Sequence, residues 1–575
     1  MNKKRKNLLF IVIVLSLCVS ACSVVQRHVR LPSVSMETTA YKAENSSADA
    51  MYHYSVGVLL RLNGETEKAI AELEKAISAD PNSSYLVVEL ISLYAEKGDF
   101  KKAIALGEKE VVKSPDNMDL RLVMGGLYLN TRDYKKAISE HEKVIELDPK
   151  NVVAYLYLSI IYAAENNFTR AEEYFKKMLK IEPDNVTGIY YYAKLLADME
   201  KYPEAEAMYK KVMALRFHFE PVIFDLGALY EKQGKTDKAI ALYRDYYDAN
   251  PARYTIKIKI AEVLIRGKRN DEAIAEYRDL LKLDPDNREA RFKLGILYYD
   301  MRKLNAAAEQ FLSILEKNIK DDRVRYLLAS TYEENGESSL AIAEYNKISS
   351  ESELFAAAQI HSAMILKKEG RISEAVQLME EAIKTKKEQV NLYLYLSTLY
   401  EETKDTKAAE KILLEGIKIF PKNVELLYAL GVVYEKTDRF SESIMEMQNI
   451  LKIDPEHADA LNFIGYSYAE RNINLEEAEK LIIKALQLKP DSGYIIDSLG
   501  WVHFKQNKLD SALTHLKKAM ELLPDDYNIV EHLGDVYHKM SNIKKAREMY
   551  KRAIQLAPDN DTLKKKLSDL ANEKK

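Results

Sequence analysis

The side chains that could carry chemistry in this chain are few and lie far apart. Three of the ten histidines, His503, His532 and His538, fall near the C-terminal end, together with Asp497 and Asp535. The histidines lack the spacing of two metal ligands on one helix turn. The aspartates could form a carboxylate pair across adjacent helices, but no nucleophile or acid partner accompanies them. The sequence also has no glycine-rich nucleotide loop, no HExxH motif and no serine nucleophile elbow. We therefore expect no enzyme activity, no cofactor and no metal site.

One cysteine stands where a lipid would be attached. It ends a leader with four basic residues at positions 3–6 and an apolar stretch over residues 8–19, which is typical of a signal peptide. The sequence Val19-Ser20-Ala21-Cys22 resembles the bacterial lipobox. By that resemblance residues 1–21 are a lipoprotein signal peptide, and Cys22 carries a diacylglyceryl group and an N-acyl chain, which together give stable anchoring. An ordinary signal peptide with a chance cysteine and a retained membrane helix are the alternatives.

The residues next to this cysteine indicate where the anchor would hold the protein. Ser23 replaces the aspartate that tends to retain lipoproteins in the inner membrane of Gram-negative bacteria. The resemblance therefore implies an outer-membrane lipoprotein that faces the periplasm. Residues 22–47 are mostly polar, and we expect them to form a lipidated, flexible tether. The other cysteine, Cys18, lies in the leader, so the mature chain would contain no disulfide.

A 34-residue repeat organises the rest of the chain. Fourteen of fifteen successive units carry alanine at the same place, and only Ser443 breaks the row. The alanines are Ala69, Ala103, Ala137, Ala171, Ala205, Ala239, Ala273, Ala307, Ala341, Ala375, Ala409, Ala478, Ala512 and Ala546. A proline recurs in the same frame, from Pro81 to Pro558, where it would end a helix. This period predicts two helices and a tight turn in each unit.

The small and aromatic residues have their own places in this frame. If Pro81 is position 32, then Gly57 is position 8, where the two helices of a unit should cross closely. Position 11 is tyrosine in ten units, beginning with Tyr94, and we expect these rings to fill the seam between neighbouring units. Gly64 and four later glycines stand at the turn, where glycine adopts positive φ with little strain.

These features resemble the tetratricopeptide repeat (TPR) family over residues 48–558. The resemblance implies an all-α solenoid of about fifteen helix-turn-helix repeats that form a right-handed superhelix, with residues 559–575 as a C-terminal capping helix. The proline is missing at Phe217, Ile319, Glu353 and Lys387. We expect that the missing prolines reflect sequence drift in non-essential turns. The alternative is a change of superhelical curvature between residues 317 and 391.

The charge argues against nucleic acid as a partner. The full chain has a net charge of −4, and removing the leader with its four positive charges would leave about −8. A phosphate-binding protein needs a basic stripe, and none stands out. Lysine and glutamate alternate along the helices, which indicates solvated faces.

In TPR proteins the first helix of each unit lines the concave face, chiefly through positions 2, 5, 9, 12 and 13. Carried over to this chain, the resemblance gives nine candidate partner-binding residues, namely Tyr190, Phe224, Phe292, Tyr326, Tyr428, Asn462, Tyr466, Asp497 and Trp501. Such a groove could take a helix or an extended peptide. Packing of some of these side chains within the groove wall is the alternative. Trp501, the only tryptophan, is either a binding anchor or part of a local structural lock.

Residues 460–540 resemble TPR lipoproteins of the Gram-negative outer membrane. One member of that class is an adaptor of a periplasmic carboxyl-terminal processing protease. The resemblance implies a lipid-anchored scaffold that binds envelope proteins, brings substrates to a periplasmic protease or organises envelope assembly. The alternative is a TPR subunit of a secretion, pilus or exopolysaccharide-export machine. The sequence leaves the partner and the oligomeric state open.

Overall fold

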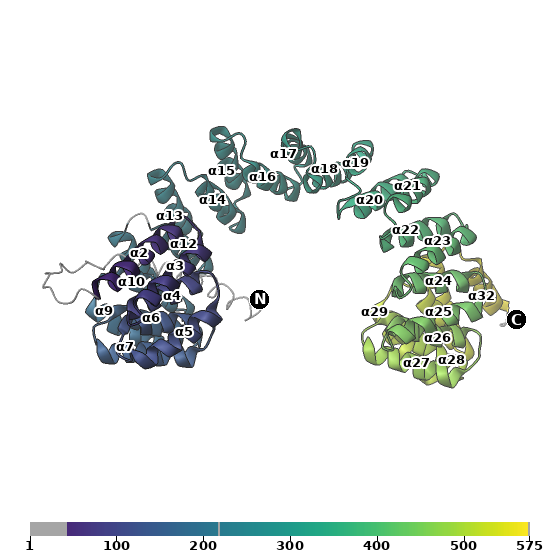
Figure 1. The fold of residues 1–575 in the computed structure, drawn as a ribbon. Coiled ribbons are helices and arrows are strands. Elements are labelled where there is room, and N and C mark those ends of the chain that lie inside the picture. Colours follow the sequence, from purple (N-terminus) through teal and green to yellow (C-terminus); the bar gives the residue numbers. More distant parts are fainter. Residues whose placement is uncertain (1–42, 217–218, 573–575) are drawn as a thin grey trace. The chain divides into compact units, whose positions relative to one another are not determined.

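The computed structural model describes residues 43–216 and 219–572, and all regular structure within these ranges is α-helical (Figure 1). The leader, Cys22 and the tether up to residue 42 lie outside the described residues, whereas residues 43–47 already belong to the first helix. The chain divides into two compact units, residues 1–285 and residues 286–575. The first unit contains α2–α15 and the second contains α16–α32.

Thirty of the thirty-one described helices form fifteen successive pairs, as the repeat predicts. The first helices of the pairs are α2 (Ala43–Leu62), α4 (Ser84–Glu96), α6 (Met118–Asn130), α8 (Val152–Ala164), α10 (Val186–Asp198), α12 (Glu220–Lys232), α14 (Tyr254–Arg266), α16 (Arg288–Asp300), α18 (Asp322–Glu334), α20 (Phe355–Lys368), α22 (Val390–Glu402), α24 (Val424–Lys436), α26 (Ala458–Glu470), α28 (Gly493–Lys505) and α30 (Tyr527–Lys539). The second helices are α3 (Thr66–Ala79), α5 (Phe100–Lys113), α7 (Tyr134–Leu147), α9 (Phe168–Ile181), α11 (Tyr202–Leu215), α13 (Thr236–Ala249), α15 (Asn270–Leu283), α17 (Leu304–Lys317), α19 (Ser338–Tyr345), α21 (Ile372–Thr385), α23 (Thr406–Ile419), α25 (Phe440–Ile453), α27 (Leu475–Leu488), α29 (Leu509–Leu522) and α31 (Ile543–Leu556). The helix α32 (Asp561–Asn572) follows the last pair.

The alanine row lies where the two helices of each pair touch. All fourteen alanines have no exposed surface, and neither has Ser443. The hydroxyl of Ser443 donates a hydrogen bond to the carbonyl of Gly431 on the facing helix, over 2.8 Å. Serine is tolerated here because this hydrogen bond satisfies its buried oxygen.

Glycine at position 8 leaves room for a large side chain of the second helix. A Cβ added to Gly295 would come within 2.7 Å of the ring of Phe311, and one added to Gly500 within 2.6 Å of Leu516. Close helix packing at this crossing is thus confirmed. The two helices contribute differently to this crossing. The first helix has a glycine without a side chain, and a bulky side chain of the second helix fills the space.

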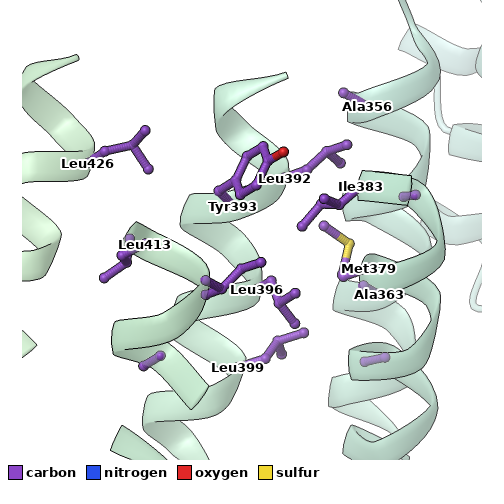
Figure 2. Packing of buried hydrophobic residues seen from close by; sticks show 14 of the residues in the cluster. Ala356, Ala363, Met379, Ile383, Leu392, Tyr393, Leu396, Leu399, Leu413 and Leu426 are labelled. Atoms are coloured by element: carbon purple, nitrogen blue, oxygen red, sulfur yellow. The ribbon is translucent and has the colours of Figure 1, made fainter. Parts of the chain in front are cut away.

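The tyrosines at position 11 fill the seams between units, as expected. Tyr128 is 4% exposed, and its hydroxyl donates to the carboxylate of Glu108 on α5, over 2.8 Å. Tyr400 makes the equivalent hydrogen bond to Glu380, over 2.6 Å. Aliphatic residues continue the core from one pair to the next. Figure 2 shows part of this core between α20 and α24, where Met379 faces the leucines of α22.

The turn inside every pair contains at least one residue in the left-handed conformation. The five glycines predicted for it, such as Gly64, have φ between 70° and 83°. Other residues stand there in the remaining pairs, for example Arg132 with φ 63°. The turn between α26 and α27 has one additional residue, and both Asn472 and Asn474 are left-handed. The strained turn is therefore a property of the repeat, and glycine is not required for it.

The weakened proline pattern coincides with one irregular pair. The second helix α19 has 8 residues, whereas the other second helices have 14. Turns over residues 346–354 replace its C-terminal half. Phe217 lies outside the described residues.

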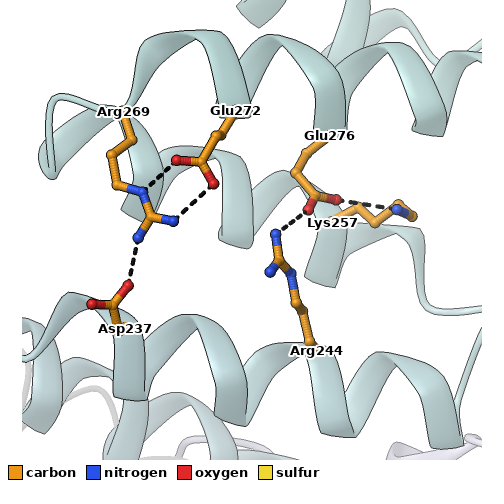
Figure 3. A network of polar contacts seen from close by, with 6 residues as sticks. All are labelled: Asp237, Arg244, Lys257, Arg269, Glu272 and Glu276. Carbon is orange, nitrogen blue, oxygen red and sulfur yellow. Dashed lines mark hydrogen bonds and ion pairs between the residues drawn. The ribbon is translucent and has the colours of Figure 1, made fainter.

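Charged side chains connect neighbouring pairs. In Figure 3, Arg244 of α13 and Lys257 of α14 both contact Glu276 of α15, over 2.9 and 3.1 Å. Arg269 links Asp237 to Glu272. The alternating charges are thus partly ion pairs across the repeat, although each exposed pair contributes at most about 1 kcal/mol.

Candidate partner-binding surface

All nine candidate residues lie on first helices, but none of them is fully exposed. Tyr190, Asp497 and Trp501 are buried, with 6–7% of their surface exposed, and the other six are half-buried. Tyr190 and Phe224 belong to the unit of residues 1–285, and the remaining seven to the unit of residues 286–575. The candidates of the two units therefore form separate clusters.

Tyr190 on α10 is held by the next pair. Its hydroxyl donates to the carboxylate of Asp225 over 2.7 Å, and its ring meets that of Phe219 edge-on, with centroids 5.0 Å apart. Burial, reinforced by the charge of Asp225, raises the pKa of Tyr190. Phe224 on α12 packs against Tyr243 of its own second helix, with centroids 6.1 Å apart. These contacts fit packing within the groove wall for Tyr190 and leave part of Phe224 accessible.

Phe292 and Tyr326 repeat the arrangement of Phe224. Phe292 on α16 packs against Phe311, and Tyr326 on α18 packs against Tyr345, with centroids 6.3 and 5.3 Å apart. In both cases the partner lies 19 residues later, on the second helix of the same pair. Phe292 and Tyr326 are thus each supported by an aromatic ring of the second helix and remain half-buried.

A histidine extends the cluster around Tyr326. His361 of α20 stacks on Tyr345 and meets Tyr326 edge-on, with centroids 5.4 and 5.8 Å apart. Its Nδ1 lies 3.0 Å from a carboxylate oxygen of Glu333, which also accepts a hydrogen bond from Tyr345 over 2.8 Å. Sequence reasoning missed His361 because it occupies position 6, which the TPR frame does not single out.

Tyr428 on α24 has neighbours of a similar kind. Its ring lies 5.9 Å from that of Phe463 on α26 and 6.4 Å from that of His457. The ring of Tyr428 remains half-buried, with no hydrogen bond described for its hydroxyl. Tyr428 therefore has a ring that is supported by two aromatic neighbours and remains half-buried.

The last three pairs contain the densest cluster. Trp501 stacks on His532 of α30, with centroids 4.0 Å apart, and on Phe504, with centroids 4.9 Å apart. The indole nitrogen of Trp501 donates to Glu470 of α26. Asp497 lies 2.9 Å from Nδ1 of His532. These are the contacts of a structural lock that joins three first helices, and they leave little of Trp501 for a partner.

The electrostatics of this cluster centre on His532. Burial alone would lower its pKa, but the charge and hydrogen bond of Asp497 outweigh burial, and the pKa of His532 is raised. Lys566 of α32 contacts Asp535 and Glu531, each over 2.7 Å. Glu531 and Asp535 of the last pair thus share one cation from the same chain.

Two further candidates border the cluster. Tyr466 of α26 is half-buried, and its ring centroid lies 6.5 Å from that of His532. Asn462 lies one helix turn earlier, and its buried Oδ1 has no hydrogen-bond partner. Of the candidates in the last three pairs, Asn462 and Tyr466 are thus half-buried, whereas Asp497 and Trp501 are buried.

Within residues 43–216 and 219–572, no three histidine, cysteine or carboxylate side chains come together as a metal site would require. None of the helices in these ranges is both long and apolar enough to cross a membrane. The clusters instead combine supported aromatic rings, hydrogen-bonding groups and paired charges, which suits recognition of a protein surface.

Comparison with known proteins gives the family. Three models of the tetratricopeptide repeat match the chain, one over residues 63–118, 122–186, 193–254 and 224–288, one over residues 162–221, 268–331, 366–431 and 503–570, and one over residues 424–457. A TPR repeat-containing protein of Pseudomonas aeruginosa is 42% identical over 52 residues, which are 9% of each chain.

Two solved structures illustrate the similarity. A tetratricopeptide repeat protein from Parabacteroides merdae is 15% identical, with a TM-score of 0.36, over 49% of this chain and 98% of that one. A thermophilic TPR protein from Thermus thermophilus is 19% identical, with a TM-score of 0.28, over 31% of this chain and 98% of that one. From its repeat frame, its fifteen helix pairs and the matches to the repeat models, the chain belongs to the tetratricopeptide repeat family.

Proposed function

We propose that this chain is a lipid-anchored scaffold of the bacterial envelope that gathers protein partners along its first helices. Its membership of the TPR family supports the scaffold role, and the sequence around Cys22 supports the anchor. The partners we expect are envelope proteins, either a periplasmic protease with its substrates or factors of envelope assembly.

The observation that carries the proposal is the repeated aromatic ring at position 5. In Phe224, Phe292 and Tyr326 the ring rests against an aromatic residue of the second helix and stays half-buried. A ring that is already ordered loses little conformational entropy when a partner covers its remaining surface. Tyr428 offers the same surface together with a hydroxyl group.

Charge adds a preference for the kind of partner. The mature chain would be acidic, near −8, as worked out from the sequence. A basic partner would therefore be attracted over a distance, and its association should slow as salt rises. The acidic residues near Trp501 are already paired, so this attraction would come from the chain as a whole.

The experiment is affinity purification from envelope membranes, with mass spectrometry of the proteins that co-elute. Tyr428→Ala should weaken the capture of a specific partner, by about 1 kcal/mol or more if the ring is an anchor. Phe440→Ala is the matched control, because Phe440 is also half-buried and belongs to the same pair, but it begins the second helix α25. If the Tyr428→Ala variant still captures the partner and the Phe440→Ala variant does not, the assignment of partner binding to the first helices is refuted.

The anchor is tested separately. Cys22→Ala should release the protein from membranes or leave an uncleaved precursor, and a palmitate analogue should label the natural chain at Cys22. A natural chain without label would overturn the anchor while leaving the partner-binding surface untouched. Co-eluting secretin or polysaccharide synthase would instead assign the scaffold to an export machine.

A further inference from the structure

Position 12 of the unit frame carries a glutamate whose charge is usually neutralised by the next unit. Four units have this glutamate, namely Glu231, Glu333, Glu401 and Glu435. Three of the four contact a cation at or directly after the C-terminal end of the next first helix. The cations are Arg266 for Glu231, Lys436 for Glu401 and Arg471 for Glu435. Position 12 is one of the positions that line the concave face in TPR proteins, so the exception among the four bears on partner binding.

The exception is Glu333 of α18. The equivalent cation would be Lys368 at the end of α20, but among the described residues this exposed lysine makes no ion pair with Glu333. The carboxylate instead contacts Nδ1 of His361 and the hydroxyl of Tyr345, over 3.0 and 2.8 Å. The tyrosine is uncharged, and a histidine carries a full charge only in acid. Neither contact therefore supplies the permanent positive charge that the other three glutamates have beside them.

The contacts of Glu333 leave part of its carboxylate free. Both are made by the same oxygen, Oε2. The other oxygen, Oε1, accepts no hydrogen bond from any residue that the structure describes, and 29% of the Glu333 side chain is exposed. Burial, and after it the charge of Glu333, raise the pKa of Tyr326, so the carboxylate lies near this half-buried ring. An unpaired carboxylate oxygen and a supported aromatic ring are thus neighbours on the candidate surface.

A carboxylate next to an aromatic ring suits an organic cation. An ammonium or guanidinium group donates charge-assisted hydrogen bonds to a carboxylate oxygen. The same group is attracted to the face of an aromatic ring when it lies within about 6 Å of the ring centre. A metal ion needs more ligands, and no three histidine, cysteine or carboxylate side chains of the described ranges come together to supply them. A lysine or arginine side chain brings one charge and an apolar stem, which matches one carboxylate and one ring.

We propose that Glu333 and Tyr326 form a subsite for a lysine or arginine side chain of the protein partner. The inference rests on the partner-binding surface proposed above and assigns one specific contact to it. The charged group of the partner would bind Oε1 of Glu333, and its stem would lie against Tyr326. His361 and Tyr345 position the carboxylate through Oε2. The partner thereby completes the ion pair that the other three glutamates at position 12 form within the chain.

The test measures how the full chain binds a peptide with a single cation. The probe is an acetylated and amidated pentapeptide with one lysine between two leucines, and its neutral counterpart has norleucine in place of lysine. Titrations followed by saturation-transfer NMR give both affinities. Glu333→Gln should weaken binding of the lysine peptide by about threefold or more and leave that of the norleucine peptide unchanged. Glutamine still accepts the hydrogen bond of Tyr345, so the fold around α18 is retained.

The matched control for the lost charge is Glu435→Gln. The side chain of Glu435 is 28% exposed, almost as much as that of Glu333, but Arg471 already contacts it over 2.7 Å. This substitution should change the affinity for the lysine peptide little. Equal losses in the Glu333→Gln and Glu435→Gln variants would overturn the proposal, because the effect would then come from the net charge of the chain. Equal binding of the lysine and norleucine peptides to the natural chain would overturn it as well.

A further variant separates the charge of Glu333 from its structural contacts. His361→Phe keeps an aromatic ring at position 6 and removes the contact with Glu333, but it leaves the negative charge in place. This variant should bind the lysine peptide at least as tightly as the natural chain does. Weaker binding would refute the subsite, since the contact with His361 would then matter more than the charge. The probe requires no envelope partner, so its result is independent of the affinity purification that tests the scaffold role.

Discussion

His141 should make the first unit of the solenoid sensitive to acid. It lies on α7 at position 24, where the equivalent residues of other pairs include Phe175 and Phe311. Its ring is fully buried, stacks on Tyr157 with centroids 4.9 Å apart, and neither ring nitrogen has a hydrogen-bond partner. Burial lowers the pKa of His141 to about 3. The histidine thus fills an aromatic site as a neutral ring.

The size of the effect follows from the two pKa values. In the unfolded chain His141 has the ordinary pKa of 6.5, whereas in the folded chain it stays neutral until about pH 3. Above pH 6.5 both states are neutral, and the histidine adds no pH dependence. Below pH 6.5 only the unfolded chain gains a proton, which favours unfolding by about 1.4 kcal/mol per pH unit. At pH 5 the loss of stability is therefore about 2 kcal/mol relative to pH 7.

The perturbation is His141→Phe. Phenylalanine should fit, because Phe311 packs against Gly295 in the way His141 packs against Gly125. Urea unfolding followed by circular dichroism at pH 7 and pH 5 measures the change in the free energy of unfolding. Hydrogen exchange of peptides from residues 118–147 tests whether the loss of stability occurs around α6 and α7. The variant should lose less stability than the natural chain between the two pH values, by about 2 kcal/mol.

The reciprocal variant Phe311→His serves as the matched control. It should introduce the same acid sensitivity around α16 and α17 and leave α6 and α7 unchanged, since contacts in a solenoid are made between neighbours. If His141→Phe and the natural chain lose stability equally between pH 7 and pH 5, the imidazole has a partner or water in solution. The reasoning from its burial would then be refuted.

Three other substitutions test the account of the fold and the C-terminal cluster. Arg132→Gly should stabilise the chain by roughly 0.5–1 kcal/mol, measured by thermal unfolding, because glycine adopts the left-handed turn without strain. Ala307→Leu should cost on the order of 1–3 kcal/mol in the same assay through overpacking of a fully buried site. In the natural chain the raised pKa of His532 should appear as a titration of Trp501 fluorescence with a midpoint above pH 6.5. The stability that the pair of Asp497 and His532 adds should be present below pH 6.5 and lost as pH rises through that midpoint. Asp497→Asn should move the midpoint below pH 6.5, and an unchanged midpoint would exclude Asp497 as the cause.

The repeat frame made the helix pairs predictable because the same steric demands recur in every unit. Alanine at position 20, glycine at position 8 and tyrosine at position 11 each correspond to one contact between helices, and the structure has these contacts where they were expected. The left-handed turn was recognised only where glycine marks it. In pairs such as that of Arg132, backbone hydrogen bonds hold the same conformation with an ordinary residue.

The accessibility of the candidate surface could not be predicted in this way. Tyr190 and Phe224 share position 5, yet Tyr190 is 7% exposed and Phe224 is half-buried. The difference comes from neighbours, since Asp225 and Phe219 enclose Tyr190. A position in the frame determines which helix face a side chain occupies, whereas its exposure depends on residues that the frame leaves variable.

The pKa values of the two buried histidines also depend on these variable neighbours. His141 and His532 are both buried, with 0% and 8% of their surface exposed, but the pKa of His141 is lowered and that of His532 is raised, because only His532 has a carboxylate beside it. That carboxylate, Asp497, lies 35 residues earlier, and Tyr190 and Asp225 are joined over the same separation. The side chain at position 5 of one unit and that at position 6 of the next therefore act as a pair. A substitution at either position alters both, so partner selection along this solenoid should follow residue pairs across adjacent first helices.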